Sequence, residues 1–189
     1  MTLLNDLLAR HSTPSRQLGA PGPDDAQLLR MLEVAVHVPD HGRLAPWRFL
    51  RIAGNARAAL GRALVSRLVE RDPDALEAKI TKERERFNHA PCVIAVIATL
   101  TAGHKIPESE QLQSGSCVCF ALLQAVDALG FGAQWLTGWA AYDPSILELL
   151  GVGANERVLG YVHIGTVMTP QEDRPRPDPA TLLTDWQPQ

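Results

Sequence analysis

Cysteine is scarce in this sequence, and no two cysteines have the spacing of a metal-binding or disulfide-forming pair. Cys92, Cys117 and Cys119 are an odd number without a CxxC motif. This excludes the disulfide framework that stabilises many small secreted domains. Because each cysteine falls in an apolar segment, we expect all three to be reduced residues of the core.

A large excess of charge of one sign is also absent. The chain has 18 Lys and Arg against 21 Asp and Glu, a net charge of -3, and no basic stretch with interleaved aromatic residues. Nucleic-acid-binding domains concentrate positive charge on one face, so we expect no nucleic-acid partner. With 46% hydrophobic residues among 189, the composition predicts one globular domain.

Uninterrupted long apolar runs are missing too. Asp6 interrupts the N-terminal apolar run, and no basic residues precede it, so this run does not resemble a signal peptide. The most apolar stretch, residues 110–129, contains Asp127 and follows Glu108, which argues against a membrane span. We therefore expect no membrane partner and a cytoplasmic location.

Familiar nucleotide and hydrolase motifs have no match. Gly130-Phe131-Gly132 lacks the third glycine of a dinucleotide fingerprint and follows a helix instead of a strand. The sequence contains no GxxxxGK[ST], GxSxG or HExxH motif. His37 and His41 would share a helix face, but Pro39 and Gly42 interrupt the helix, so we expect no metal site there.

The stretch that is present in place of these motifs is a long apolar helix. Residues 110–129 are apolar on almost every side, which indicates burial in a core or at a subunit interface. Gly130 ends the helix, and residues 133–137 follow as a strand. The small residues 114–116 would let a backbone or a flat ligand come close.

The rest of the chain predicts an α+β fold. In chain order we expect a short leucine-rich helix capped by Thr2, a helix opened by Asp24 with Gln27, a strand at 47–53, helices at 55–71 and 74–87, a strand at 92–98, a short helix between Asp143 and Gly151, and a strand at 157–165. Because helices and strands do not alternate strictly, we expect a mainly antiparallel sheet of about four strands between helices.

Two regions differ in composition. Residues 1–168 form the single predicted domain, whereas residues 169–189 are rich in proline and predict an extended C-terminal arm. Leu182, Leu183 and Trp186 in this arm are apolar anchors. The natural place to bury them is a second subunit.

Four clusters hold the polar and aromatic groups that remain. They are Arg10–Ser12 with Arg16, His37–His41, Trp135–Gly138 and Arg174–Arg176. Taken singly, each has a structural explanation in helix-end bonding, loop structure, core packing or solvation. Together they offer cationic groups, a hydroxyl, an aromatic ring and backbone amides, which a flat phosphorylated cofactor requires.

At these residues the chain resembles the nitroreductase family of flavoproteins, in particular its short members, from Leu4 to about Thr166. The specific points are Arg10 and Ser12, residues 35–41 followed by Pro46-Trp47, His104–Pro107 before Glu110-Gln111, Gly130–Gly132 leading to Trp135, and residues 160–166. The resemblance implies a nitroreductase-like fold with the buried central helix at a dimer interface, and an obligate homodimer that binds FMN at that interface in two sites.

The resemblance also implies roles for individual residues. Arg10, His11 and Ser12 would hold the phosphate and ribityl end of FMN, His37 and His41 would reach the partner subunit's flavin, Trp135, Leu136, Thr137 and Gly138 would lie beside the isoalloxazine ring, and Arg174 would add a basic phosphate ligand. Residues 125–130 match a stretch associated with nicotinamide nucleotide. His11 and His37 stand where relatives often have arginine.

The function implied is transfer of a hydride from NAD(P)H through FMN to a small acceptor such as a nitroaromatic, a quinone or an enone. One site used in turn by donor and acceptor predicts ping-pong kinetics, and no side chain is expected to act as nucleophile or base. Two alternatives stay open. One is a flavin-binding homodimer without turnover, and the other is a metal-dependent protein that uses His37, His41 and His104.

Overall fold

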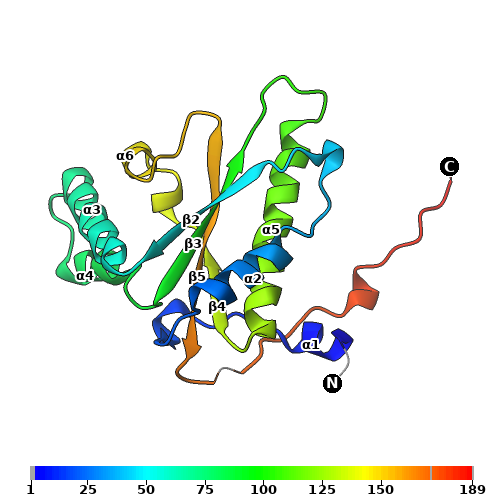
Figure 1. The fold of residues 1–189 in the computed structure, drawn as a ribbon, viewed down its shortest axis with the longest axis horizontal. Helices are drawn as coiled ribbons and strands as arrows, with labels where there is room; N and C mark the ends of the chain where they lie inside the picture. The colour runs from blue at the N-terminus through cyan, green and yellow to red at the C-terminus, as the bar shows by residue number, and fades with distance from the viewer. Residues whose placement is uncertain (1–2, 171, 189) are drawn as a thin grey trace.

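A five-stranded antiparallel sheet separates two layers of helices (Figure 1). The computed structural model describes residues 3–170 and 172–188, so the predicted cap Thr2 lies outside the described residues. The helices are α1 (Leu3–Ala9), α2 (Asp25–Ala35), α3 (Asn55–Arg71), α4 (Glu77–Glu85), α5 (Glu108–Ala128) and α6 (Pro144–Leu149). The strands are β1 (Leu18–Gly19), β2 (Trp47–Ala53), β3 (Cys92–Thr99), β4 (Gly132–Leu136) and β5 (Glu156–Val167).

Strand β5 is the longest strand and has neighbours on both sides. It pairs with β3 along one edge, while β4 and the short β1 follow one another along its other edge. Strand β2 lies beyond β3 and pairs with it from Trp47 to Ala53. Every residue of β3 from Cys92 to Ala98 is buried, which confirms the prediction of a strand covered on both faces.

Two hydrophobic cores lie on the two faces of the sheet. Helices α2 and α5 cover one face, and α3 and α6 contribute to the core on the other (Figure 1). Local signals place two of these helices. Asp24 and Gln27 form the predicted capping box of α2, and Asp143 caps α6 with Pro144 at its first turn.

Helix α5 is buried on one side only within a single chain. Val118 and Leu122 are fully buried, whereas Phe120 is 52% exposed and Cys117 is also exposed. The prediction that all three cysteines are core residues is therefore wrong for Cys117, because the helical period turns it away from the buried face. In the part of the chain that is described, no helix is both long and apolar enough to cross a membrane.

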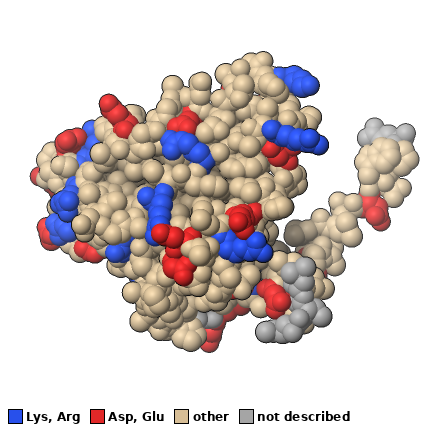
Figure 2. Space-filling model, in the orientation of Figure 1, with Lys and Arg blue, Asp and Glu red and all other residues tan. Residues whose placement is uncertain are grey.

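The N-terminal helix and the C-terminal arm expose large apolar side chains. In α1, Leu4 and Leu8 are exposed, and in the arm Leu182, Leu183 and Trp186 are exposed, the last by 82%. On the face drawn in Figure 2, acidic and basic side chains are interspersed and the arm stands away from the body. Large apolar side chains exposed in this way are typical of segments that meet another protein.

An ion pair between β2 and β5 stabilises the protein, and this contribution is lost at acid pH. Arg48 donates to both carboxylate oxygens of Glu156, at 2.6 and 2.7 Å, and Gly153 N donates to the same side chain, which is 17% exposed. The hydrogen bonds from Arg48 lower the pKa of Glu156 from 4.5 to about 2. Burial would raise this pKa, but Arg48 and the bond from Gly153 N outweigh it. The contribution of this pair is therefore present above pH 4.5 and is lost as the pH falls towards 2.

We expect Glu156→Gln to lower the free energy of unfolding at pH 7 by roughly 1 to 2 kcal/mol, allowing for solvent screening. The difference from the unsubstituted protein should shrink as the pH falls from 5 to about 2, because both proteins then lack the charged pair. Urea unfolding across this pH range measures the difference in the free energy of unfolding. Asp25→Asn is the matched control, since the pair between Asp25 and Arg51 is mostly exposed. Equal losses at every pH would contradict the assignment.

Candidate functional site

The segment that follows α1 runs beside β4. Thr13 N donates to Ala133 O at 3.0 Å, and Ser15 N donates to Gln134 Oε1 at 2.6 Å. These bonds bring the cluster Arg10–Ser12 next to the beginning of β4. Arg10 and His11 are half-buried there, and Ser12 is exposed.

The cluster Trp135–Gly138 lies at the other end of the same strand. At ~3.3 Å per residue, the four steps from Ala133 to Thr137 span ~13 Å. Strand β4 therefore joins two of the four predicted clusters along one edge of the sheet. The separation of the two clusters along β4 suits a ligand that has a phosphate at one end and a flat ring at the other.

Trp135 is held firmly in this position. Its indole Nε1 donates to Leu159 O at 3.1 Å, and a Cβ on Gly160 would lie 1.9 Å from the same nitrogen. The ring therefore packs directly on the β5 backbone, where only glycine leaves room. Trp135 and Leu136 are half-buried, while Thr137 is exposed.

A cation that was not identified from the sequence lies beside Gly138. Arg86 donates through Nε and Nη2 to the two carboxylate oxygens of Glu83, at 2.7 and 2.6 Å, and the Glu83 side chain is buried. A Cβ on Gly138 would lie 3.2 Å from Nη1, the nitrogen that Glu83 does not engage. Gly138 has φ +89, a conformation that favours glycine.

The charge pattern around Arg86 does not distinguish it from its neighbours. Glu83 and Arg86 belong to the stretch predicted as the helix 74–87, whose many charged residues favour a solvated surface helix. The structure shortens this helix to α4 and buries the Glu83 side chain. One local signal was available, since Phe87 directly follows Arg86 and is buried.

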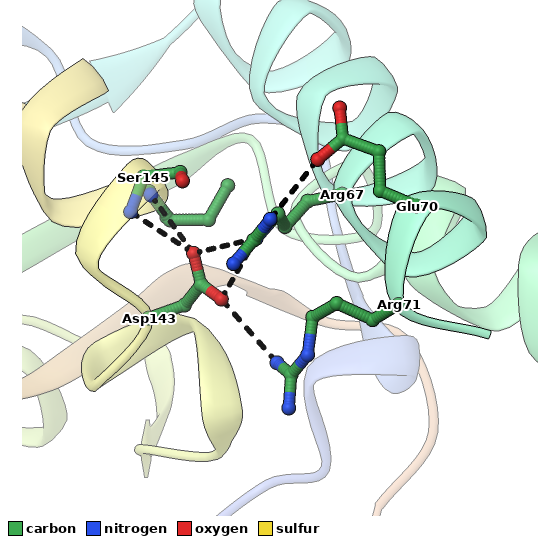
Figure 3. Close-up of polar contacts among 6 residues, drawn as sticks. Arg67, Glu70, Arg71, Asp143 and Ser145 are labelled. Atoms are coloured by element: carbon green, nitrogen blue, oxygen red, sulfur yellow. Dashed lines mark hydrogen bonds and ion pairs between the residues drawn. The ribbon is translucent and has the colours of Figure 1, made fainter.

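The turn after Gly138 is fastened to α3 (Figure 3). Arg67 Nε donates to both Asp143 carboxylate oxygens, at 3.2 and 3.0 Å, and Arg71 Nη1 donates at 3.3 Å. Burial raises the pKa of Asp143, but hydrogen bonds from Arg67 and from the backbone of α6 outweigh burial and lower it overall. Arg71 also lies over the Trp139 ring, 5.6 Å from its centroid.

The beginning of the C-terminal arm lies near the first cluster. His11 and Pro170 both line a cavity of about 340 Å³. Arg176 pairs with Asp173 and lowers the pKa of its carboxyl, to which the charge of His11 also contributes. Arg174 is exposed next to Asp173. The arm thus brings basic groups towards Arg10–Ser12, although Arg176 and not Arg174 pairs with Asp173.

His41 lies at the opposite end of α5. Its Nδ1 is 2.7 Å from Glu110 Oε2 in the first turn of that helix, whereas His11 lines its cavity together with Asp127 in the last turn. The 17 steps between Glu110 and Asp127 span ~25 Å at ~1.5 Å per residue. A single chain therefore does not bring His41 and Arg10–Ser12 to one small ligand.

Two further predicted regions are less directly placed. His37 is exposed at the end of α2, where its N–H donates to Val34 O at 3.1 Å. Of the predicted nicotinamide stretch, Ala125 and Val126 are buried and residues 127–130 are exposed. Part of this stretch lines a cavity of about 740 Å³ between α1, α2 and α5.

The three histidines of the metal alternative do not come together. His41 pairs with Glu110, and His104 Nδ1 accepts from Ile106 N at 3.1 Å. Within residues 3–170 and 172–188, no three His, Cys, Asp or Glu side chains are grouped so as to hold a metal ion. The geometry gives the metal alternative no support.

The chain matches the family model described as the nitroreductase family over residues 7–166. A Haemophilus influenzae protein that carries the name of an NAD(P)H nitroreductase is 34% identical over 173 residues, 91% of this chain and 92% of that protein. YdjA of Escherichia coli K12, with a similar name, is 30% identical over 180 residues, 95% of this chain and 97% of YdjA. The chain therefore belongs to the nitroreductase family and is by class an oxidoreductase.

A solved structure shows the same fold. A variant of the nitroreductase NfnB from Sphigopyxis sp. strain HMH has a TM-score of 0.79 to this chain at 19% identity, with 99% of each chain covered. At this identity the similarity establishes the fold. The predicted nitroreductase-like α+β fold is confirmed, with one more strand in the sheet than expected.

Proposed function

We propose that two copies of this chain bind FMN between them and transfer a hydride from NAD(P)H to a small acceptor such as a nitroaromatic, a quinone or an enone. The observation that carries this proposal is the position of the predicted clusters relative to β4 and α5. Two clusters lie along β4, and His41 lies ~25 Å away at the other end of α5. The NfnB structure is described as that of an FMN- and NADPH-dependent enzyme, which supports the choice of cofactor.

Arg10, His11 and Ser12 would hold the phosphate end of FMN. A guanidinium and a hydroxyl beside the start of β4 supply charge-assisted and neutral hydrogen bonds to phosphate oxygens. Arg174 is exposed in the arm and would add a second guanidinium. His37 and His41 of the partner subunit would approach the same molecule.

Trp135, Leu136, Thr137 and Gly138 would lie beside the isoalloxazine ring. Bound FMN would supply the redox chemistry, accepting a hydride from NAD(P)H and passing it to the acceptor. Arg86 Nη1, next to Gly138, would stabilise the negative charge that reduction adds. The turn after Gly138 is fixed on α3 by Asp143, so these groups are held in place before the ligand arrives.

No side chain in this arrangement would act as nucleophile or general base. Donor and acceptor would occupy the same face in turn, which gives ping-pong kinetics. Two chains would be needed for each site, and the exposed leucines of α1 with Leu182, Leu183 and Trp186 of the arm would be buried between them.

Visible absorption of the purified protein, identification of the flavin released on denaturation, and NADH or NADPH oxidation with a quinone acceptor test this proposal together. Bound FMN and turnover with either donor support it, and sedimentation should give a dimer. Protein that holds FMN but is inert with all donors and acceptors would favour the alternative of a flavin-binding homodimer for storage or sensing. Monomeric protein without flavin would overturn both.

We expect His11→Ala and His37→Ala each to weaken FMN binding several-fold, because each variant lacks a ring N–H that would donate to the ligand. Fluorescence titration of the apoprotein with FMN measures the affinity of each variant. His11→Arg and His37→Arg are the controls, because a guanidinium also donates to phosphate and should keep the affinity. Unchanged affinity in both alanine variants would assign FMN binding to other groups.

A further inference from the structure

The loop between α2 and β2 has an unusual backbone. Gly42 has φ 72, and two residues that are not glycine, Arg43 and Ala45, have φ 56 and 45. Side chains other than glycine rarely adopt this left-handed conformation, and it persists only where the surroundings impose it. His41 directly precedes these residues, so its position depends on what holds the loop.

Bonds within the loop and a contact with the segment before α5 hold this loop. The Asp40 carboxylate accepts from Leu44 N at 3.2 Å and from Ala45 N at 2.8 Å. From the other side, Ile106 packs beneath Gly42, where a Cβ would lie 2.4 Å from Ile106 Cδ1. In Figure 1 this loop and the one before α5 lie side by side at the same end of the helix.

The segment before α5 is itself tightly fixed. Gln111 is buried, accepts from Thr101 N at 2.9 Å, and donates to Thr101 O at 3.3 Å and to Ile106 O at 3.0 Å. Ile106 is therefore held through its carbonyl oxygen by Gln111 and through its N–H by His104 Nδ1, and it supports Gly42. This explains how a strained loop is maintained next to an exposed histidine.

We infer that Glu110 is the positioning residue for His41. Its Oε2 lies 2.7 Å from His41 Nδ1, although both side chains are substantially exposed. An ionised carboxylate only accepts hydrogen bonds, so Nδ1 carries the proton and Nε2 faces away from Glu110. Holding one ring nitrogen in this way fixes the direction in which the other can meet a ligand. This inference rests on the proposed function, in which His41 meets the partner subunit's FMN.

A double-mutant cycle in FMN affinity tests it. We expect Glu110→Ala to weaken FMN binding by about fivefold and Glu110→Gln, which keeps an acceptor, to recover part of the loss. In a His41→Ala background, Glu110→Ala should have no further effect, because its only route to FMN is gone. A general structural role would instead give the same loss in both backgrounds and would overturn the inference.

The controls separate this inference from the proposed function. Glu108→Ala removes a carboxylate from the same helical turn and should leave FMN affinity unchanged. Nitrogen NMR of His41 should show Nδ1 protonated in the unsubstituted protein and a mixture of tautomers in Glu110→Ala. If His41→Ala binds FMN normally, the inference fails while the proposed function stands. If the unsubstituted protein binds no FMN, the proposed function itself has failed.

Discussion

Replacing Gly160 by alanine should destabilise the protein by roughly 2 to 3 kcal/mol and displace Trp135. The added Cβ would lie 1.9 Å from Trp135 Nε1 and 3.1 Å from Leu136 O. The indole must then leave its bond to Leu159 O, which removes the ring from its place beside the proposed flavin site. Denaturant unfolding measures the loss of stability. FMN titration should show the affinity weakened at least tenfold, and tenfold corresponds to about 1.4 kcal/mol.

Two comparisons make this prediction specific. Gly153→Ala is the matched control, because a Cβ there meets Glu156 only at ordinary contact distance, 3.7 Å, and should change stability by less than about 0.5 kcal/mol. In a Trp135→Ala background, the cost of Gly160→Ala should fall, since the main obstructing group is gone. Equal costs with and without Trp135 would show that the packing of the indole on Gly160 is not the cause.

Arg86→Gln should lower the turnover of NAD(P)H with a quinone by about 100-fold. The substitution removes the positive charge beside Gly138 and should shift the midpoint potential of bound FMN to more negative values. Arg86→Lys keeps a charge and should retain much more of the activity, although it lacks the second donor that binds Glu83. Steady-state kinetics and a redox titration of the holoprotein measure both effects.

The buried partner of Arg86 must be controlled for. Loss of Arg86 leaves the Glu83 carboxylate buried without its ion pair, which is costly by itself. The double variant Glu83→Gln with Arg86→Gln removes that unpaired charge and should recover stability but not turnover. Arg84→Gln, an exposed position on the same helix, should change neither. A full recovery of activity in the double variant would contradict a direct electrostatic role.

Local signals in the sequence were sufficient where the structure depends on neighbouring residues. Asp24 with Gln27 and Asp143 with Pro144 mark helix starts through bonds to nearby N–H groups, and both starts are confirmed. Strand β2 and helix α3 have the predicted bounds as well. The two-residue strand β1 was not predicted, because it is too short to show an alternating pattern.

Contacts between distant segments could not be predicted in this way. Arg86 meets Gly138 across more than fifty residues, and no periodicity relates α4 to the end of β4. The clusters Arg10–Ser12 and Trp135–Gly138 could be recognised only as a set through the family resemblance. Their arrangement along β4 and the placement of Cys117 on the exposed side of α5 required the fold.

In the proposed dimer, helix α5, which has 21 residues, would hold two unlike halves of a site apart, one at each of its ends. A chain substituted at Arg10 would still contribute an intact His41 to its partner's site. A chain substituted at His41 would still contribute an intact Arg10. A mixed pair of two such inactive chains would then contain one complete site and one that is defective twice over. Two variants that are each inactive alone would therefore recover part of the activity when their chains form mixed dimers.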